Sequence, residues 1–336
     1  MNASLPFARG TLDSVGRIRE SVPPSDLLER GVQAVGHLEG GVAGIRVFVL
    51  DEVASLAVVD PPIDEGGPLA LWDPAQGAAS LIGERLTAYT IGRTRDGVLH
   101  VAVVVPRGTD VPGGRWVDVR RSGHLLDGDD SAVALGGVAL VRWHAQAHFC
   151  ARCGARVEVT SSGWTTTCPS CGTIEYPRQD PAVIMAVTDG DGRVLLAHNT
   201  AWRPHFWSLL AGFVEAGESP DRAVRREVLE EVGLRIGEVR FADAQPWPFP
   251  RSLMLGHFAR LAPGTPAIPT PDGAEIDRAR FFTREELEEA IRTGEIEAPA
   301  PTAIARRLLE EWFGAPLPGP SGAPGATGLP GAPLTA

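Results

Sequence analysis

The segment from Gly212 to Leu234, GFVEAGESPDRAVRREVLEEVGL, constrains the fold of this chain more than any other. Ser219 is a good N-cap, Pro220 suits the first helical position, and Gly233 suits the position after the last turn. Side chains four residues apart share one face of a helix. On that spacing, an apolar face is formed by Val224, Val228 and Val232. The segment therefore predicts a loop, a helix over 220–232 whose valine face packs on a core, and a closing loop.

Three glutamates lie beside the valines on the predicted helix. Glu227, Glu230 and Glu231 are spaced i, i+3 and i+4, so we expect them on one face. Arg226 precedes Glu230 by four residues and can hold it by a salt bridge. Crowded carboxylates repel one another, and a divalent cation resolves that repulsion. The pattern favours a metal site over a solvated acidic helix face. Glu218 is either a further ligand or a structural cap or salt-bridge partner.

The four cysteines form a single pattern of two CxxC pairs separated by fourteen residues: Cys150, Cys153, Cys168 and Cys171. Pairs at about this separation are typical of a tetrahedral zinc ribbon. Redox-active pairs or disulfides are the alternatives, and the glycines after each pair, Gly154 and Gly172, favour zinc. Four protein ligands leave no open coordination position. We therefore predict one structural Zn²⁺ per chain that takes no part in the chemistry.

The segment from Gly212 to Leu234 also carries a known motif: Gly, five residues, Glu, seven residues, then Arg-Glu-aliphatic-X-Glu-Glu-X-Gly-aliphatic. The fixed positions here are Gly212, Glu218, Arg226, Glu227, Glu230, Glu231 and Gly233. The chain thus resembles the Nudix hydrolases, which split a nucleoside diphosphate linked to another group. The resemblance implies an α/β fold, namely an α/β/α Nudix sandwich joined to the zinc ribbon and an N-terminal α+β domain.

A second motif, Gln-Pro-Trp-Pro-Phe-Pro-Arg-Ser over residues 245–252, narrows the resemblance. Its three prolines stiffen the backbone. The aromatic rings of Trp247 and Phe249 either stack on a base or a nicotinamide ring or pack the loop itself. With the cysteine pattern and the junction Glu-Tyr-Pro-Arg-Gln-Asp-Pro over 175–181, the region of about 148–313 resembles the NADH pyrophosphatase family of Nudix hydrolases.

That resemblance implies cleavage of NADH, and less efficiently of NAD⁺, to reduced nicotinamide mononucleotide and AMP. It also implies removal of NAD caps from the 5′ ends of RNA, and a homodimer whose ribbon and aromatic residues help close the pocket. One alternative is a Nudix hydrolase for ADP-ribose or a nucleoside triphosphate, against which the 245–252 motif argues. A non-catalytic Nudix–ribbon binding protein is a second alternative, although every acid of the box is present. A mainly RNA-directed role is the third.

The resemblance further implies a catalytic Mg²⁺ or Mn²⁺ site whose ligands are the Ala211 carbonyl, Glu227, Glu231 and Glu275. A metal-activated water would attack one phosphorus atom. Glu230 is the candidate for orienting or deprotonating that water, and Glu231 could combine the roles of ligand and base. Arg226 would hold the acids in place.

Substrate-binding residues carried over from the same family are Tyr176, Phe213, Gln245, Pro246, Trp247, Pro248, Phe249, Pro250, Arg251, Ser252 and Ala305. Tyr176 and Phe213 would flank the nicotinamide. The chain departs from the family at Gly163, which precedes Trp164 where members can carry Glu. A polar substrate contact is expected to be missing there.

The length of 336 residues indicates more than one domain. We expect an α+β domain over 1–147, the ribbon over 148–175, the Nudix domain over 176–314, and a disordered Pro/Gly/Ala-rich tail over 315–336. The expected strands are 45–50, 56–59, 69–72, 98–105, 182–187, 194–197, 235–242, 253–260 and 279–283. The expected helices are 26–35, 131–144, 220–232, 284–292 and 302–313. Scattered histidines, which we interpret as structural, are His100, His124, His144 and His148.

Composition excludes several function classes. The net charge of −11 argues against a general binder of nucleic acid or anionic membranes. All 31 basic residues are Arg, which excludes a lysine-dependent mechanism. No basic-plus-apolar leader and no apolar run approaching about 18 residues is present. We therefore expect a cytoplasmic protein that does not interact with a membrane.

Overall fold

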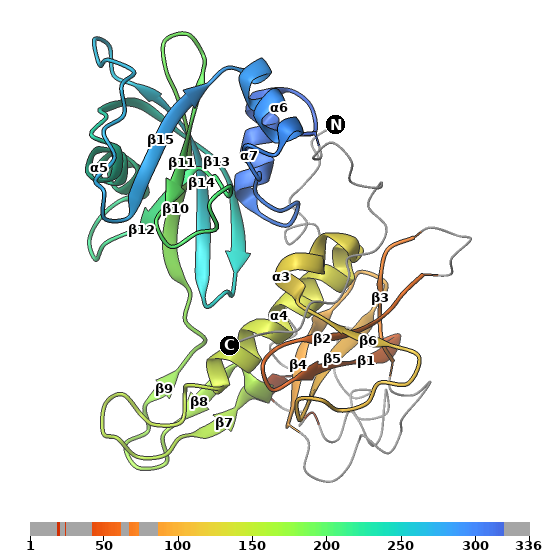
Figure 1. Cartoon of the computed structure of the whole chain (residues 1–336). Helices are drawn as coiled ribbons and strands as arrows, with labels where there is room; N and C mark the ends of the chain where they lie inside the picture. Colours follow the sequence, from red (N-terminus) through yellow and green to blue (C-terminus); the bar gives the residue numbers. More distant parts are fainter. Residues whose placement is uncertain (1–18, 21–23, 25–41, 62–66, 74–86, 319–336) are drawn as a thin grey trace. The chain divides into compact units, whose positions relative to one another are not determined.

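The computed structural model describes residues 19–20, 24, 42–61, 67–73 and 87–318 (Figure 1). The chain divides into two compact units. The first unit is Met1–Pro181 with Ala244–Met254, and the second unit is Ala182–Asp243 with Leu255–Ala336. The helix expected over 26–35 lies outside the described residues.

The first unit contains a six-stranded sheet: β1 (Gly44–Asp51), β2 (Leu56–Val59), β3 (Ala70–Leu71), β4 (Thr87–Arg93), β5 (Val98–Val105) and β6 (Arg115–Val117). The strand order is β3-β2-β1-β5-β4, with β6 paired to β2. β1 and β5 run parallel, from Gly44 opposite Val98 to Asp51 opposite Val105. Strands β1, β2, β3 and β5 are where the sequence predicted strands, whereas β4 and β6 were not predicted.

Helix α4 (Gly128–His144) closes the core of the first unit, preceded by the short α3 (Val119–Ser122) and a 3-10 turn over Gly123–Leu125. Its side chains at Val133, Val138 and Leu140 are buried in one cluster with Phe48 and Leu50 of β1. Apolar burial of this kind is the main stabilising contribution to a core. The helix expected over 131–144 is confirmed, with one more turn at its start.

The zinc ribbon also belongs to the first unit. It is a three-stranded antiparallel sheet of β7 (Glu158–Thr160), β8 (Thr165–Thr167) and β9 (Ile174–Glu175). The sulfur atoms of the four cysteines all lie within 4.8 Å of one another, and all four thiols are free. The Sγ–Sγ distances are 3.7 Å for Cys150–Cys171 and 3.5 Å for Cys153–Cys168. A tetrahedral zinc with bonds of about 2.3 Å spaces its sulfurs by about 3.8 Å. The geometry therefore fits a four-thiolate site and excludes disulfides.

The 3-10 turn over Ser161–Gly163 explains the glycine that departs from the family pattern. Gly163 has φ +97°, and a Cβ atom there would lie 2.1 Å from the ring of Tyr89. The Gly163 carbonyl oxygen lies 2.8 Å from His144 Nε2, and the indole of Trp164 donates to the Thr90 carbonyl at 2.7 Å. A glutamate at this position would require Tyr89 to move. In this chain the position therefore serves the packing of the ribbon against β4 and α4.

The second unit contains another six-stranded sheet: β10 (Asp180–Thr188), β11 (Val194–Asn199), β12 (Leu210–Phe213), β13 (Ile236–Trp247), β14 (Ser252–Leu261) and β15 (Ile276–Phe282). The order is β13-β14-β10-β11-β15, with β12 paired to β10. Helix α5 (Pro220–Val232) lies on one side of this sheet, and α6 (Arg284–Thr293) and α7 (Ile304–Phe313) lie on the other (Figure 1). The expected α/β/α sandwich is confirmed.

Residues 315–318, which were expected to belong to the disordered tail, are part of the described structure. Leu317 is only 4% exposed. Its N–H donates to Glu310 Oε1 at 3.1 Å, and its carbonyl oxygen accepts from Arg306 Nη2 at 2.8 Å. These contacts hold residues up to 318 against α7, because a buried leucine outweighs the local Pro/Gly composition.

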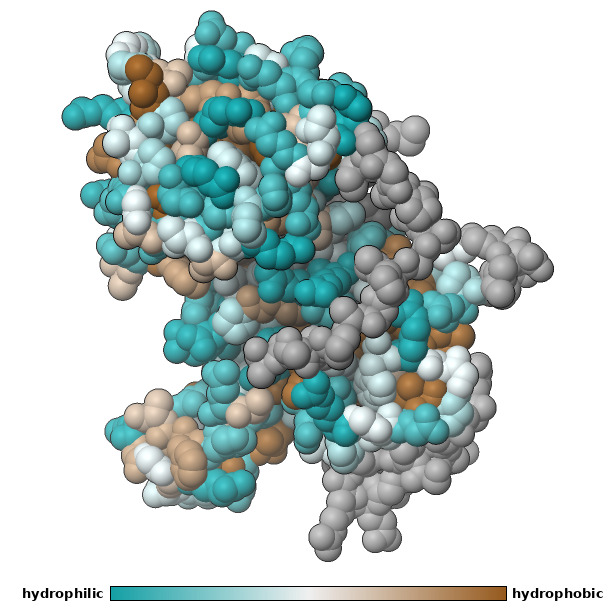
Figure 2. Space-filling model, viewed as in Figure 1, coloured by the Kyte–Doolittle hydropathy of each residue, from teal (hydrophilic) through white to brown (hydrophobic). Residues whose placement is uncertain are grey.

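Hydrophilic residues cover most of the visible surface of the second unit (Figure 2). Within the ranges that the structure describes, no helix is both long enough and apolar enough to cross a bilayer.

Purified protein is expected to contain about one Zn²⁺ per chain, measurable by elemental analysis. Cys168→Ser should lower Tm by at least about 5 °C, because it removes a ligand from a closed structural site whose metal contributes folding free energy. Ser170→Ala, in the same CxxC turn but exposed, is the matched control and should leave Tm unchanged. Zinc-free protein with an unaltered Tm, or a disulfide under reducing conditions, contradicts this prediction.

Candidate active site

The box helix α5 begins at Pro220 and ends at Val232, as predicted. Ser219 occupies the N-cap position with extended backbone, but its side chain makes no capping hydrogen bond. Gly233 terminates the helix with φ 68°, in the left-handed region that favours glycine. The three valines of the apolar face are fully buried in the core of the second unit. This frame fixes the direction of each glutamate on the helix.

The three box glutamates lie within about 100° of one another around the helix, as expected for one face, but they differ strongly in exposure. Glu231 is 6% exposed, whereas the side chains of Glu227 and Glu230 are 13% and 58% exposed. The cause is helical phase. At about 100° per residue, Glu231 lies only about 20° from Val224, Glu227 about 60° and Glu230 about 120°. Burial therefore falls from Glu231 to Glu230 around the helix.

Glu231 is the most perturbed acid of this group. Burial, followed by the charges of Glu227, Glu275, Asp272 and Glu230, raises the pKa of Glu231 to about 8. Its Oε2 atom is buried without a hydrogen-bond partner among the described residues. A buried carboxylate oxygen without a partner is costly, and a divalent cation would satisfy it. The donor set therefore fits a hard cation.

Arg226 binds the other acids of the box. Its Nη1 donates to Glu227 at 2.8 Å and to Glu230 at 3.0 Å, which confirms the predicted i, i+4 salt bridge. Its Nε and Nη2 donate to the two carboxylate oxygens of Glu218 at 3.1 and 2.9 Å. Nη2 also donates to the Phe213 carbonyl at 2.8 Å. Glu218 was interpreted either as a metal ligand or as a structural residue. In the structure it is a salt-bridge partner of Arg226.

Strand β12 brings the backbone of Ala211 and Gly212 to the same acids. A Cβ atom on Gly212 would lie 2.0 Å from the carboxylate carbon of Glu227. The first glycine of the box is therefore required by close packing of Glu227 on the strand. Ala211, the expected carbonyl ligand, is the adjacent residue and is exposed.

Glu275 precedes β15 and lies close to the box helix. Its negative charge contributes to the raised pKa of Glu227, after burial and the charge of Glu230, and to that of Glu231. Within the described ranges, only the four cysteines place the ligand atoms of three or more residues within 4.8 Å of one another. Glu227, Glu231 and Glu275 are neighbours, but they do not form a group of this kind.

The predicted substrate residues are distributed over both units. Tyr176 lies in the first unit and is 65% exposed, and Phe213 lies in the second unit and is 59% exposed. Ala305 is buried in the first turn of α7. Each of these remains a prediction from the family resemblance.

Half of the segment 245–252 is strand and not the loop that its prolines suggested. β13 continues to Trp247, β14 starts at Ser252, and only the four residues between them form a turn. The segment belongs to the first unit, where Gln245 is fully buried. Arg251 Nε donates to Asp180 at 2.6 Å. Pairing of β13 with β14 thus extends into a region whose composition indicated a loop.

The two aromatic rings of this segment pack on each other and on the core of the first unit. Trp247 and Phe249 are in edge-to-face contact with centroids 5.1 Å apart. Both pack against the core cluster that contains Tyr89. The guanidinium of Arg142 lies 5.3 Å from the centre of the Phe249 ring. Much of each ring is therefore engaged in packing. Of the two roles considered for these rings, stacking on the substrate and packing, the structure shows packing.

Several residues near Glu275 were not predicted from the sequence, chiefly Asp272, His198 and Asp277. The only sequence signal was the Asp272–Gly273 dipeptide, which is typical of a turn. His198 and Asp277 come from different strands, and no local pattern connects them.

Two family models match the chain: "NUDIX domain" over residues 178–302 and "NADH pyrophosphatase zinc ribbon domain" over 145–176. NAD-capped RNA hydrolase NudC of Mycobacterium bovis (strain BCG / Pasteur 1173P2) is 42% identical over 211 residues, covering 60% of this chain and 66% of that protein. The protein of the same name from Stutzerimonas stutzeri is 39% identical over 201 residues, covering 60% and 68%. A crystal structure of a NUDIX hydrolase from Nitrosomonas europaea aligns over 50% of this chain and 94% of its own, at 26% identity and a TM-score of 0.37.

The ribbon model covers all four clustered cysteines, which identifies that cluster as the structural zinc site. The Nudix model covers Glu227, Glu231, Glu275 and the arginine that holds the box acids. The matched region spans about two thirds of the length of the curated relatives. The chain belongs to the Nudix hydrolase family, in the zinc-ribbon group that includes the curated relatives named NAD-capped RNA hydrolase NudC.

Proposed function

We propose that this chain hydrolyses the pyrophosphate of NADH and NAD⁺ to nicotinamide mononucleotide (reduced from NADH) and AMP, and that it removes NAD caps from RNA 5′ ends. One observation carries the chemistry: Glu231 is buried with an unpartnered Oε2 beside Glu227 and Glu275. The names of the relatives support the substrate.

The residues of the chain would have the following roles in the reaction. The Ala211 carbonyl, Glu227, Glu231 and Glu275 would hold Mg²⁺ or Mn²⁺. When bound, the cation supplies charge neutralisation for the pyrophosphate and a water of lowered pKa. Arg226 fixes the carboxylates of Glu227 and Glu230 by direct hydrogen bonds.

Glu230 is suited to receive the proton of the attacking water. It is the most exposed of the three box acids, and only its Oε2 atom accepts from Arg226. Its Oε1 atom would take the proton, while Arg226 keeps the carboxylate oriented. A positioned base of this kind contributes about 10²–10⁴-fold.

A second candidate substrate is ADP-ribose. The observation that favours it is the partial burial of Trp247 and Phe249 in the first unit, because rings engaged in packing offer less surface for stacking a nicotinamide. The Nudix chemistry would be the same for both substrates.

The family resemblance adds a cytoplasmic homodimer to this proposal. The four cysteines form no disulfide, which is compatible with a reducing compartment. Light scattering on the purified protein measures the assembly directly.

Glu227→Gln and Glu231→Gln should each reduce metal-dependent turnover of NADH at least about a hundredfold, because each removes the charge of one ligand while keeping its shape. Glu288→Gln, an exposed acid on α6, is the control and should retain wild-type turnover. Circular dichroism and Tm would verify folding of all three variants. Near wild-type activity in either ligand variant would exclude this metal assignment.

With Mg²⁺ or Mn²⁺, the protein should convert NADH to AMP and reduced nicotinamide mononucleotide with a higher kcat/KM than for ADP-ribose. Liquid chromatography of the products, with an NAD-capped RNA oligonucleotide as a parallel substrate, measures this. Faster cleavage of ADP-ribose would overturn the proposed substrate and leave the Nudix chemistry intact.

Trp247→Ala separates stacking from packing. If the ring stacks on substrate, the ratio of kcat/KM for NADH to that for ADP-ribose should fall about ten- to a hundredfold, since base–aromatic stacking contributes about 1–3 kcal/mol. We expect this fall, together with a lower Tm from the lost core contacts. The ratio is independent of the fraction of folded enzyme. A lower Tm with an unchanged ratio would show that the ring only packs.

A further inference from the structure

The loop that leads into β15 is fastened to the C-terminal end of the box helix. The N–H of Thr270 donates to the Val232 carbonyl at 2.9 Å, and the N–H of Asp272 donates to the Glu231 carbonyl at 3.0 Å. Carbonyl groups in the last turn of a helix have no partner within it, so they are available for such contacts. Asp272 is thereby bonded through its backbone to a box glutamate.

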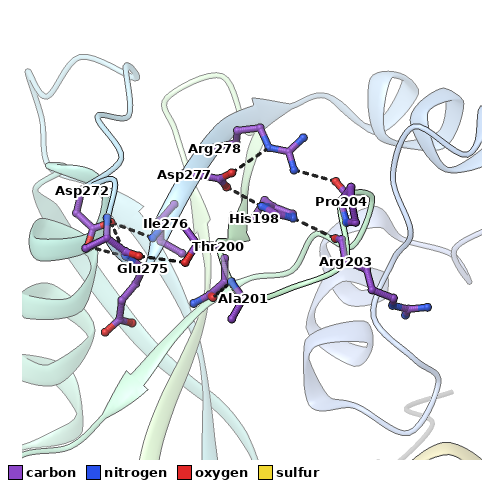
Figure 3. A network of polar contacts seen from close by, with 12 residues as sticks. His198, Thr200, Ala201, Arg203, Pro204, Asp272, Glu275, Ile276, Asp277 and Arg278 are labelled. Carbon is purple, nitrogen blue, oxygen red and sulfur yellow. Dashed lines mark hydrogen bonds and ion pairs between the residues drawn. The ribbon is translucent and has the colours of Figure 1, made fainter. Parts of the chain in front are cut away.

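The side chain of Asp272 turns back onto its own loop. Its Oδ1 atom accepts from the N–H groups of Ala274 at 3.1 Å, Glu275 at 3.2 Å and Ile276 at 2.9 Å (Figure 3). Asp side chains stabilise tight turns through local contacts of this type. Asp272 therefore fixes the backbone from which the Glu275 side chain projects.

Thr200, the residue after β11, holds the same loop from the opposite side. Its N–H donates to the Glu275 carbonyl at 2.8 Å, and its hydroxyl donates to the Ala274 carbonyl at 3.0 Å. In Figure 3 the Glu275 carboxylate points away from these contacts. The backbone of Glu275 is thus held on both sides, while its carboxylate projects free of the network.

A bulge in the sheet lies directly beyond this point. The pairing of β11 with β15 shifts between His198 and Asn199, where Asn199 lies opposite Ile276 and the register skips Asp277. Asp277 Oδ1 lies 2.6 Å from Nδ1 of the buried His198 ring, whose Nε2 lies 3.0 Å from the Arg203 carbonyl. Bulges re-aim side chains locally, and this one is braced by a buried ring.

We propose that Asp272, opposed by Thr200, is the positioning residue of Glu275. By bonding the Glu231 carbonyl with its backbone and the Glu275 N–H with its side chain, it fixes the Glu275 carboxylate beside Glu227 and Glu231, so that the three bind one divalent cation. Asp272 itself does not touch the ion. The inference rests on the proposed function for the identity of the ligands, and it does not depend on the substrate.

Two variants separate positioning from charge. Asp272→Ala removes the acceptor and should raise the Kd for Mn²⁺, measured by electron paramagnetic resonance on the full chain without substrate, about tenfold. Asp272→Asn removes the charge but keeps an oxygen acceptor, and should stay within about twofold of the wild type. Asp191→Ala is the control. This exposed acid lies in the turn before β11, at the strand end remote from Asn199, and should leave the Kd unchanged.

A double-mutant cycle tests whether the effect passes through Glu275. Glu275→Gln alone should weaken Mn²⁺ binding, and adding Asp272→Ala to it should change the Kd by less than about twofold. If thermal melts show Asp272→Ala to be unfolded, Thr200→Val tests the opposing contact and should raise the Kd about threefold.

The inference is overturned by an unchanged Kd in Asp272→Ala, or in the folded Thr200→Val that replaces it. It is equally overturned if Asp272→Asn weakens binding as much as Asp272→Ala, which would indicate a pure charge effect, or if the full tenfold loss persists in the Glu275→Gln background. NADH turnover by the wild type is measured in a separate assay, which tests the proposed function and not the inference. Absence of turnover with the expected Mn²⁺ series would reject the proposed function and keep the inference.

Discussion

The arrangement of the candidate site depends on the contacts of a single guanidinium group. Arg226 donates to Glu218, Glu227, Glu230 and the Phe213 carbonyl, so one side chain joins the box helix, the preceding loop and strand β12. These carboxylates hold the pKa of Arg226 above its usual value, with Glu218 as the largest contributor. Arg suits this role because its planar group offers several fixed donors, which the single ammonium of Lys does not.

Arg226 binds the neighbouring acids, but it does not bind Glu231. Glu231 is therefore the acid of the box whose carboxylate lacks a full set of hydrogen bonds. Its helical phase places it almost in line with the valines, where burial opposes its charge. Its Oε2 atom is buried, yet none of the described residues donates a hydrogen bond to it. A buried carboxylate without a hydrogen-bond partner destabilises the fold, and a bound cation would offset that cost. Functional sites commonly contain groups whose pKa is shifted in this way.

Patterns within one segment were predicted well from the sequence. The bounds of α5 were correct because its end signals and its valine spacing are both local, and the four-cysteine site followed from spacing alone. The extent of β13 could not be predicted, because the strand continues through Pro246 to Trp247, where the proline-rich composition indicated a loop. The different burial of Glu227, Glu230 and Glu231 follows from their positions around the helix relative to the valines. It could have been predicted from the sequence but was not.

Contacts between residues that are distant in the sequence could not be predicted from local sequence patterns. Asp272 meets Glu231 across about forty positions of sequence, and His198 meets Asp277 across 79. Such pairs are brought together by strand order and register, which a single sequence specifies only through the folded chain. The substrate residues Tyr176, Phe213 and Ala305 remain predictions from the family resemblance.

The hairpin of β13 and β14 has strands in the second unit and a tip, Ala244–Met254, in the first. The chain therefore passes between the units three times, and no single cut separates them cleanly. A fragment that begins at residue 182 would retain the tip without the residues of the first unit that Trp247 and Phe249 pack against. Two exposed aromatic rings on a free hairpin favour aggregation and cleavage by proteases. The Nudix fold of this chain is consequently a poor candidate for expression or engineering as an isolated module.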